Sequence, residues 1–233
     1  MNIERFIKEL EKINITLNEF QLKQLHDYYL LLIEWNQKIN LTRITDEEDV
    51  YLKHFFDSLT LYKIMDLKQE ITMCDVGSGA GFPGIVLKIV FPNLNIVLID
   101  SLNKRIKFLN EVIDTLQLKN IESIHCRMED FSRKNRNKFD VVVSRAVSNI
   151  NIMAEISIPA LKIGGHMILM KANCEEEIES SNKTLKLLNS KINKINKFIL
   201  PVENSNRTII DVIKILDTPL KYPRSIDKIK KSL

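Results

Sequence analysis

The residues best suited to binding a ligand lie in one glycine-rich segment. Four of the six glycines of this 233-residue chain fall between Gly77 and Gly84, directly after the apolar run 71–76. A glycine turn between a strand and a helix lets a ligand approach the backbone, and the start of the helix offers unpaired N–H groups. Asp100 ends the next apolar run, at the spacing where an acidic residue accepts hydrogen bonds from ribose hydroxyls. The segment therefore predicts a site for a nucleoside-containing ligand.

Two ligand classes fit this segment. Gly79, Gly81 and Gly84 satisfy the G-x-G-x-x-G pattern of dinucleotide-binding enzymes, which is weak evidence by itself. Asp75, just before the loop, would repel a pyrophosphate, whereas S-adenosylmethionine has no phosphate and carries two cationic groups. The residues therefore favour S-adenosylmethionine. A nicotinamide-dependent oxidoreductase is the alternative, and a purely structural glycine turn is a smaller one.

Two further residues suit the adenine end of such a ligand. Met128 and Glu129 follow the apolar run 121–126, and this turn faces the adenine ring in nucleotide-binding folds of this kind. An adenine needs an apolar side chain against its face and an acceptor for its exocyclic amine. Met128 and Glu129 supply both, although a core methionine in a solvated acidic turn describes the segment equally well.

Short apolar runs alternate with helical patterns through most of the chain. Stretches 83–91 and 104–116 have helical periodicity and lie between strand candidates, which indicates an α/β fold with a mostly parallel sheet and helices on both faces. We expect seven strands with an antiparallel last hairpin, in the Rossmann-like class I S-adenosylmethionine-dependent methyltransferase fold. A polar helix is predicted at 182–197. The strand candidates are 71–76, 95–100, 121–126, 139–144, 166–171, 197–202 and 208–216.

The N-terminal part of the chain has a different pattern. Apolar residues recur every three or four positions between Leu22 and Trp35, and the pattern repeats over 50–65. We therefore expect an all-helical N-terminal extension at 1–68, followed by a methyltransferase domain at 69–233. The two parts are expected to form one compact unit.

Composition limits the classes of function. Hydrophobic residues make up 45% of the chain and charged residues 27%, as in soluble globular proteins. No apolar run is long enough to span a membrane and no signal peptide is visible, so we expect a cytoplasmic protein without a membrane partner. The three separated cysteines lack a pairing motif, and no metal site is predicted. Basic residues outnumber acidic ones by 34 to 30, with the excess toward the C-terminus, which would suit a polyanionic partner.

The fourth strand candidate ends in Ser144, Arg145 and Ala146, where methyltransferases of this fold bind the methyl acceptor. Neither the Asn/Asp-Pro-Pro-aromatic motif of amine methyltransferases nor the Pro-Cys nucleophile of carbon-5 enzymes is present. An acceptor with an exposed lone pair needs only positioning, so we expect no catalytic base and no nucleophile. Arg145 is predicted to position the acceptor, although it could instead pair with a neighbouring carboxylate.

Several motifs occur together, in an order that is similar to one family. They include Asp57-Ser58-Leu59, the block 75–84, Asp100-Ser101 with Lys104-Arg105, Ser144-Arg145-Ala146, Gly164-Gly165 with Lys171, Arg207, and Tyr222-Pro223-Arg224. From about residue 35 to residue 224 the chain resembles the RsmG (GidB) family, bacterial methyltransferases that modify guanine N7 in 16S ribosomal RNA. Ala172, where the family usually has glycine, and the tail after Arg224 depart from the pattern.

The resemblance implies a cofactor, a partner and site residues. The cofactor would be S-adenosyl-L-methionine and the partner 16S rRNA of the small ribosomal subunit; we also expect a monomer. The cofactor-binding residues would be Gly77, Gly79, Phe82, Asp100, Met128, Glu129 and Arg145. The candidates for binding RNA would be His54, Asp57, Lys171, Arg207, Tyr222 and Arg224. A non-catalytic RNA-binding protein that keeps the fold is a further alternative, which the intact glycine loop disfavours.

His54 has two expected roles of equal weight, a structural one and contact with RNA. A role as catalytic base is disfavoured, because guanine N7 already carries a lone pair. We therefore expect His54→Ala to keep at least a tenth of the turnover, and a loss as large as that of Arg145→Ala would contradict this view.

Overall fold

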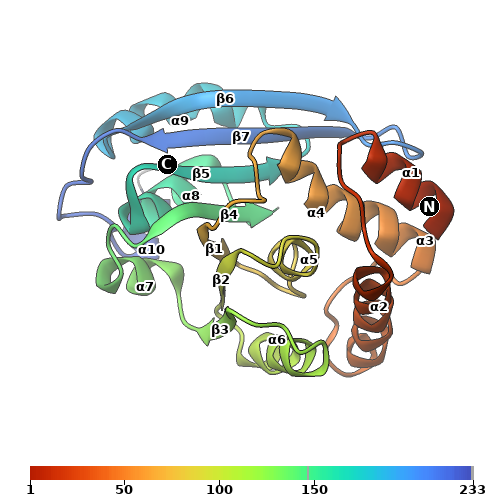
Figure 1. The fold of residues 1–233 in the computed structure, drawn as a ribbon. Helices are drawn as coiled ribbons and strands as arrows, with labels where there is room; N and C mark the ends of the chain where they lie inside the picture. The colour runs from red at the N-terminus through yellow and green to blue at the C-terminus, as the bar shows by residue number, and fades with distance from the viewer. Residues whose placement is uncertain (146, 232–233) are drawn as a thin grey trace.

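The fold is built on a sheet of seven strands. A computed structural model describes residues 1–145 and 147–231, so Ala146 of the Ser144-Arg145-Ala146 motif lies outside the described residues. The strand order across the sheet is β3-β2-β1-β4-β5-β7-β6 (Figure 1). The strands are β1 (Thr72–Val76), β2 (Asn95–Asp100), β3 (Ile121–His125), β4 (Phe139–Arg145), β5 (Leu161–Lys171), β6 (Ser190–Ile199) and β7 (Asn206–Lys214).

The pairing of the strands confirms the predicted fold class. The pairs β1–β2, β1–β4, β2–β3 and β4–β5 are parallel, while β7 runs antiparallel to both β5 and β6. Successive strand side chains alternate between two cores, so that Met73 packs on one face and Cys74 on the other. The chain leaves β1 toward β2 on one side and returns to β4 on the other, which is where doubly wound sheets bind ligands.

The N-terminal helices cover one face of the sheet together with α5 and α6. Helix α2 starts with a capping box between Asn18 and Gln21 and buries Leu25, Tyr28 and Leu32, the stripe expected from the sequence. These side chains share one hydrophobic core with the sheet. The elements on this face are α1 (Ile3–Glu11), α2 (Glu19–Ile39), α3 (Glu47–Val50), the π-helix η1 (Tyr51–Phe56), α4 (Asp57–Leu59), the 3-10 helix η2 (Thr60–Lys63), α5 (Gly84–Val90) and α6 (Asn103–Thr115).

The opposite face carries the remaining helices. Helix α8 is buried along its whole length, because α7, α9 and α10 pack against it. Within the described part of the chain, no helix is long and apolar enough to cross a membrane. The elements on this face are α7 (Met128–Lys134), α8 (Ile150–Ser157), the 3-10 helix η3 (Ile158–Ala160), α9 (Glu175–Leu187) and α10 (Ile226–Lys230).

One predicted element is wrong. The polar helix expected at 182–197 is the end of α9, a left-handed residue at Asn189 (φ 55°), and then strand β6. The lysines and asparagines that suggested a solvated helix belong to an edge strand, where charged side chains discourage pairing with other chains. The strand expected at 197–202 therefore starts at Ser190 and ends at Ile199.

Candidate functional site

A cavity of about 1070 Å³ opens at the carboxyl ends of β1, β2, β4 and β5. Its wall combines the glycine loop and Asp100 with residues from the amino end of β7 and from the N-terminal helices. We call the part lined by Gly77, Asp100 and Met128 the cofactor side, and the part lined by Arg145 and Arg207 the acceptor side. Most residues predicted for cofactor and RNA therefore face one common space.

The glycine loop between β1 and α5 lines the cavity with Gly77, Ser78, Gly79 and Ala80. Gly77 has a φ of +70°, and a Cβ there would lie 2.7 Å from the Val147 side chain. The N–H groups of Gly77 and Ser78 donate to the Ile99 carbonyl (2.8 and 3.1 Å), which ties the loop to the end of β2. Only glycine therefore fits at position 77 without strain.

Asp100 fixes the same loop from the end of β2. Its buried carboxylate accepts hydrogen bonds from the N–H groups of Gly79 (2.9 Å) and Leu102 (2.9 Å) and from Arg105 Nη1 (3.2 Å). These donors set the orientation of the carboxylate at the cavity wall. Arg105 also lines the cavity; the sequence suggested it as one of many basic residues that suit RNA but not as a residue of this site.

Met128 and Glu129 belong to the first turn of α7 and not to an open turn. Both side chains are buried and both line the cavity. The Arg127 guanidinium lies 4.0 Å from the Glu129 carboxylate. The fold thus brings this pair to the same side of the cavity as the glycine loop.

Asp75 does not face the cavity. It is fully buried beneath the loop, where Oδ2 accepts a hydrogen bond from the Gly84 N–H (2.9 Å) and Oδ1 has no partner among the described residues. Burial raises the pKa of Asp75 to about 7. Asp75 therefore cannot repel a phosphate at the mouth of the loop, as the sequence suggested, and the choice of ligand depends on other residues.

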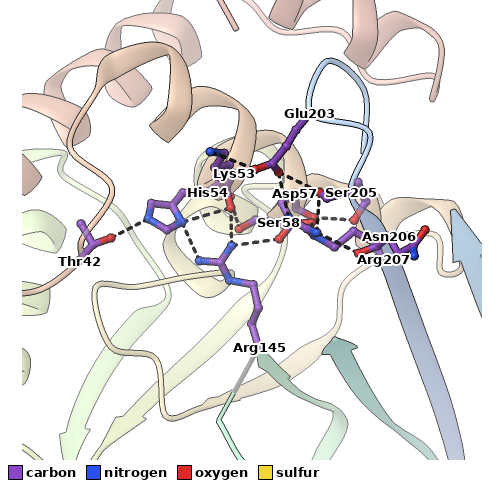
Figure 2. Close-up of polar contacts among 11 residues, drawn as sticks. Thr42, Lys53, His54, Asp57, Ser58, Arg145, Glu203, Ser205, Asn206 and Arg207 are labelled. Carbon is purple, nitrogen blue, oxygen red and sulfur yellow. Dashed lines mark hydrogen bonds and ion pairs between the residues drawn. The ribbon is translucent and has the colours of Figure 1, made fainter. Parts of the chain in front are cut away.

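Arg145, at the end of β4, is held by the N-terminal part of the chain (Figure 2). Its Nη1 donates to the Lys53 carbonyl (2.8 Å) and to Asp57 Oδ2 (3.1 Å), and its Nη2 donates to His54 Nδ1 (3.0 Å). The guanidinium also lies over the Phe82 ring, with Cζ 5.1 Å from the ring centroid. Arg145 thus pairs with a carboxylate and lines the cavity at the same time.

His54 is neutral, and both of its ring nitrogens have polar neighbours. Nδ1 lies 3.0 Å from Arg145 Nη2, which can only donate, and 3.2 Å from the Lys53 carbonyl, which can only accept, while Nε2 lies 3.0 Å from Thr42 Oγ1. Burial and then the charge of Arg145 lower the pKa of His54 to about 3. The ring stacks on Phe82, with 4.3 Å between centroids. Both ring nitrogens are engaged within the protein, which argues against a role as general base.

Asp75 gives the stability of the protein a testable pH dependence. Between about pH 4 and pH 7, folded Asp75 keeps a proton that the unfolded chain has lost, so this group lowers the free energy of unfolding as the pH rises. Asp75→Asn removes the group. We expect the stability of this variant relative to the wild type, measured by urea denaturation, to rise by a few kcal/mol across that window.

His54→Gln is the control, because its stability relative to the wild type is expected to change with pH in the opposite direction. Folded His54 stays neutral down to about pH 3, whereas the unfolded side chain gains a proton below about pH 6.5, so His54 raises the free energy of unfolding as the pH rises. The stability of His54→Gln relative to the wild type should fall over the same range. A difference between Asp75→Asn and the wild type that is constant with pH would contradict the raised pKa of Asp75.

Arg207 and Lys171 line the cavity and are both ion-paired. Arg207 Nε donates to Asp57 Oδ1 (2.9 Å). Lys171 Nζ lies 2.9 Å from the Glu177 carboxylate and donates to the Ser148 carbonyl (2.9 Å). Acidic partners thus fix the positions of two cations that can be reached from the cavity.

Tyr222 and Arg224 lie outside the cavity lining. Arg224 forms a bidentate ion pair with Glu155 of α8 through Nε (2.8 Å) and Nη2 (2.6 Å), and Tyr222 is buried in the core on that face. The structure does not bring these two residues together with the other predicted site residues. Instead the tail reaches the cavity through Ile226 and Lys230 of α10.

Three residues of the acceptor side were not predicted. Lys53 Nζ lies 3.1 Å from Glu203 Oε1, which joins the π-helix to the turn between β6 and β7. Their 150-residue separation left no local signal in the sequence. Thr42, which contacts His54 Nε2 (3.0 Å), carries no charge, and the sequence gave it no role in the site.

Comparison with known proteins decides the family. Residues 21–209 match the GidB family model, described as rRNA small subunit methyltransferase G. The chain belongs to this family. The protein named Ribosomal RNA small subunit methyltransferase G in Bacillus licheniformis is 47% identical to it over 227 residues, covering 96% of this chain and 95% of the relative. Its namesake in Staphylococcus carnosus is 44% identical over 236 residues, covering 100% and 98%.

The comparison with solved structures concerns the fold. The crystal structure of a SAM dependent methyltransferase from Aquifex aeolicus superposes with a TM-score of 0.56 at 19% identity, covering 75% of this chain and 97% of that one. The predicted Rossmann-like methyltransferase fold is therefore confirmed. Membership of the rRNA small subunit methyltransferase G family confirms the predicted family and the predicted class of enzyme, a methyltransferase.

Proposed function

We propose that this member of the rRNA small subunit methyltransferase G family transfers a methyl group from S-adenosyl-L-methionine to N7 of a guanine in 16S rRNA. One observation carries the proposal. A single cavity joins a glycine loop and an oriented carboxylate to an arginine-rich acceptor side, in a chain of this family. The contacts on the acceptor side favour a role in positioning the acceptor base over a role in proton transfer, because His54 is neutral and both of its ring nitrogens have partners within the protein.

The cofactor side fits S-adenosylmethionine. Asp100 is held by three donors at the cavity wall, where its carboxylate can accept from ribose hydroxyls, and Met128 offers an apolar side chain for the adenine. When bound, the cofactor supplies a methyl group on a positively charged sulfur. The residues that would hold it are Gly77, Gly79, Phe82, Asp100, Met128, Glu129 and Arg145.

Guanine N7 suits the residues of the acceptor side. The lone pair of N7 forms the new bond to the methyl carbon as the carbon–sulfur bond breaks, so the base loses no proton. The protein then needs only to hold the guanine in line with the methyl group and to exclude water. Arg145, fixed by Lys53, His54 and Asp57, is the residue placed to do so.

The partner is 16S rRNA of the small subunit, and the enzyme acts on it as a monomer in the cytoplasm, where bacterial ribosomes are assembled. Lys171 and Arg207 line the acceptor side and support a role in holding the RNA. RNA contacts by His54, Tyr222 and Arg224 stay predictions. The helices of residues 1–68 share a hydrophobic core with the sheet. This supports one compact unit made of the N-terminal extension and the methyltransferase domain at 69–233.

Titration calorimetry of Asp100→Ala tests the cofactor assignment. The wild type should bind S-adenosylmethionine and give no heat with NADH, and the loss of the charged acceptor should weaken binding about 30-fold. Asp140→Ala is the matched control, because Asp140 holds Thr72 and Lys162 outside the cavity lining. Binding of NADH without binding of S-adenosylmethionine would overturn the assignment.

Transfer of tritiated methyl groups tests the acceptor. Small subunits from a bacterium that lacks this methyltransferase should gain label, and hydrolysis of their 16S rRNA should release 7-methylguanine. Label in any other base, or in 23S rRNA, would contradict the proposed acceptor.

A further inference from the structure

Asp57 lies where it cannot easily meet RNA. Its side chain is 8% exposed, and each carboxylate oxygen already accepts from an arginine of the acceptor side. Oδ2 accepts from Arg145 Nη1 (3.1 Å) and Oδ1 from Arg207 Nε (2.9 Å) (Figure 2). A carboxylate repels phosphates and is here turned toward two guanidinium groups, so direct contact with RNA is a poor account of this residue.

The carboxylate joins three distant segments of the chain. Asp57 begins α4, Arg145 ends β4, and Arg207 lies at the start of β7, with β5 between the two strands. Charge-assisted hydrogen bonds to one buried carboxylate hold both guanidinium planes at a set distance from each other. Figure 2 shows the two arginines converging on Asp57 from opposite sides.

The helix that carries Asp57 is shaped to receive Arg145. In an α-helix the Asp57 N–H would donate to the Lys53 carbonyl, but it donates to the carbonyls of Leu52 and His54 instead, at the end of the π-helix η1. The Lys53 carbonyl accepts from Arg145 Nη1 (2.8 Å). This segment therefore supplies three acceptors to Arg145, from Lys53, His54 and Asp57.

Both arginines keep donors for a substrate. Three of the five N–H groups of Arg145 have partners among the described residues. Arg207 uses Nε for Asp57 and Nη1 for Ser205 Oγ (2.9 Å) and the Asn206 carbonyl (2.9 Å), with Nη2 3.8 Å from a Glu203 oxygen. Because both side chains line the cavity, the remaining N–H groups can meet anionic oxygens there.

We propose that Asp57 is a positioning residue that orients Arg145 and Arg207 so that together they bind a phosphodiester of the RNA beside the target guanine. The inference rests on the proposed function. It adds that the group of the RNA bound on the acceptor side is a backbone phosphate, and that Asp57 orients the arginines that bind this phosphate. Asp57 acts through the two arginines and touches neither the RNA nor the cofactor.

Asp57→Asn tests this role, because asparagine has nearly the shape of aspartate but replaces one carboxylate oxygen with an NH₂ group. Arg145 keeps its contacts with the Lys53 carbonyl and His54, so we expect the NH₂ group to displace Arg207. We expect kcat/KM for methylation of unmodified small subunits to fall about 50-fold, while the affinity for S-adenosylmethionine in titration calorimetry changes less than twofold. The slope of the logarithm of RNA affinity against the logarithm of salt concentration should also become shallower by the amount expected for about one lost phosphate contact. Glu48→Gln is the control: Glu48 lies on the preceding helix α3, is exposed, and pairs with the N-terminal ammonium outside the cavity lining, so its substitution should change none of these values.

Coupling to Arg207 separates positioning from a structural role. If Asp57 acts through Arg207, the double variant Asp57→Asn/Arg207→Gln should lose about as much activity as Asp57→Asn alone. Arg207→Lys keeps the charge but not the Nε contact, and it should lose activity as well. The inference would be overturned if the losses of the two single variants multiplied in the double variant. It would also be overturned if Asp57→Asn lowered the cofactor affinity and the Tm together with the activity. An inactive wild type would instead refute the proposed function.

Discussion

Arg145→Ala is expected to lower kcat/KM for methyl transfer about 1000-fold, equivalent to about 4 kcal/mol of transition-state stabilisation. Truncation removes the donor to Lys53, His54 and Asp57 and leaves three buried or half-buried acceptors without it. The acceptor side then loses the group that we propose to position the guanine, and small misplacements of a reacting base cost about 100-fold or more. Methyl incorporation into unmodified small subunits measures the effect.

His54→Ala is the comparison that gives this result its meaning. The ring accepts one hydrogen bond from Arg145, whereas the contacts of Arg145 to Lys53 and Asp57 do not depend on it. We therefore expect His54→Ala to keep at least a tenth of the wild-type turnover. Equal losses in the two variants would mean that His54 takes part in the reaction directly, against the neutral, doubly engaged ring described above.

Local features of the site could be predicted from the sequence. The glycine loop and Asp100 were recognisable because a strand, a tight turn, a helix and the end of the next strand follow each other within residues 71–100. Their chemistry follows from that order alone. Asp75 shows the limit: the sequence gives the charge of a residue, but its burial beneath the loop depends on packing against α5.

The acceptor side depends on contacts that no local pattern encodes. Asp57 meets Arg145 across 88 residues and Arg207 across 150, so the sequence showed three charged residues without their pairing. The same reason explains the wrong helix at 182–197. Its lysines and asparagines suit a solvated helix and an edge strand alike, and only the neighbouring strand β7 decides between them.

Gly84→Ala is expected to destabilise the protein by about 3 to 5 kcal/mol and to weaken cofactor binding more than 100-fold. A Cβ at this position would collide with the Leu98 side chain and lie 2.7 Å from Asp75 Oδ2, and both neighbours are fully buried. Overpacking costs about 1 to 3 kcal/mol, and the hydrogen bond from the Gly84 N–H to Asp75 would be lost as well. Urea denaturation and calorimetry with S-adenosylmethionine measure the two effects.

Gly164→Ala separates this collision from the general cost of replacing a glycine. Gly164 has a φ of +80°, and no atom lies within 4 Å of the Cβ that alanine would add there. The substitution should therefore cost only the left-handed backbone strain of roughly 1 to 2 kcal/mol and leave cofactor affinity unchanged. If Gly84→Ala bound S-adenosylmethionine as tightly as Gly164→Ala does, the contact between Asp75 and the start of α5 would not be what holds the loop in its binding conformation.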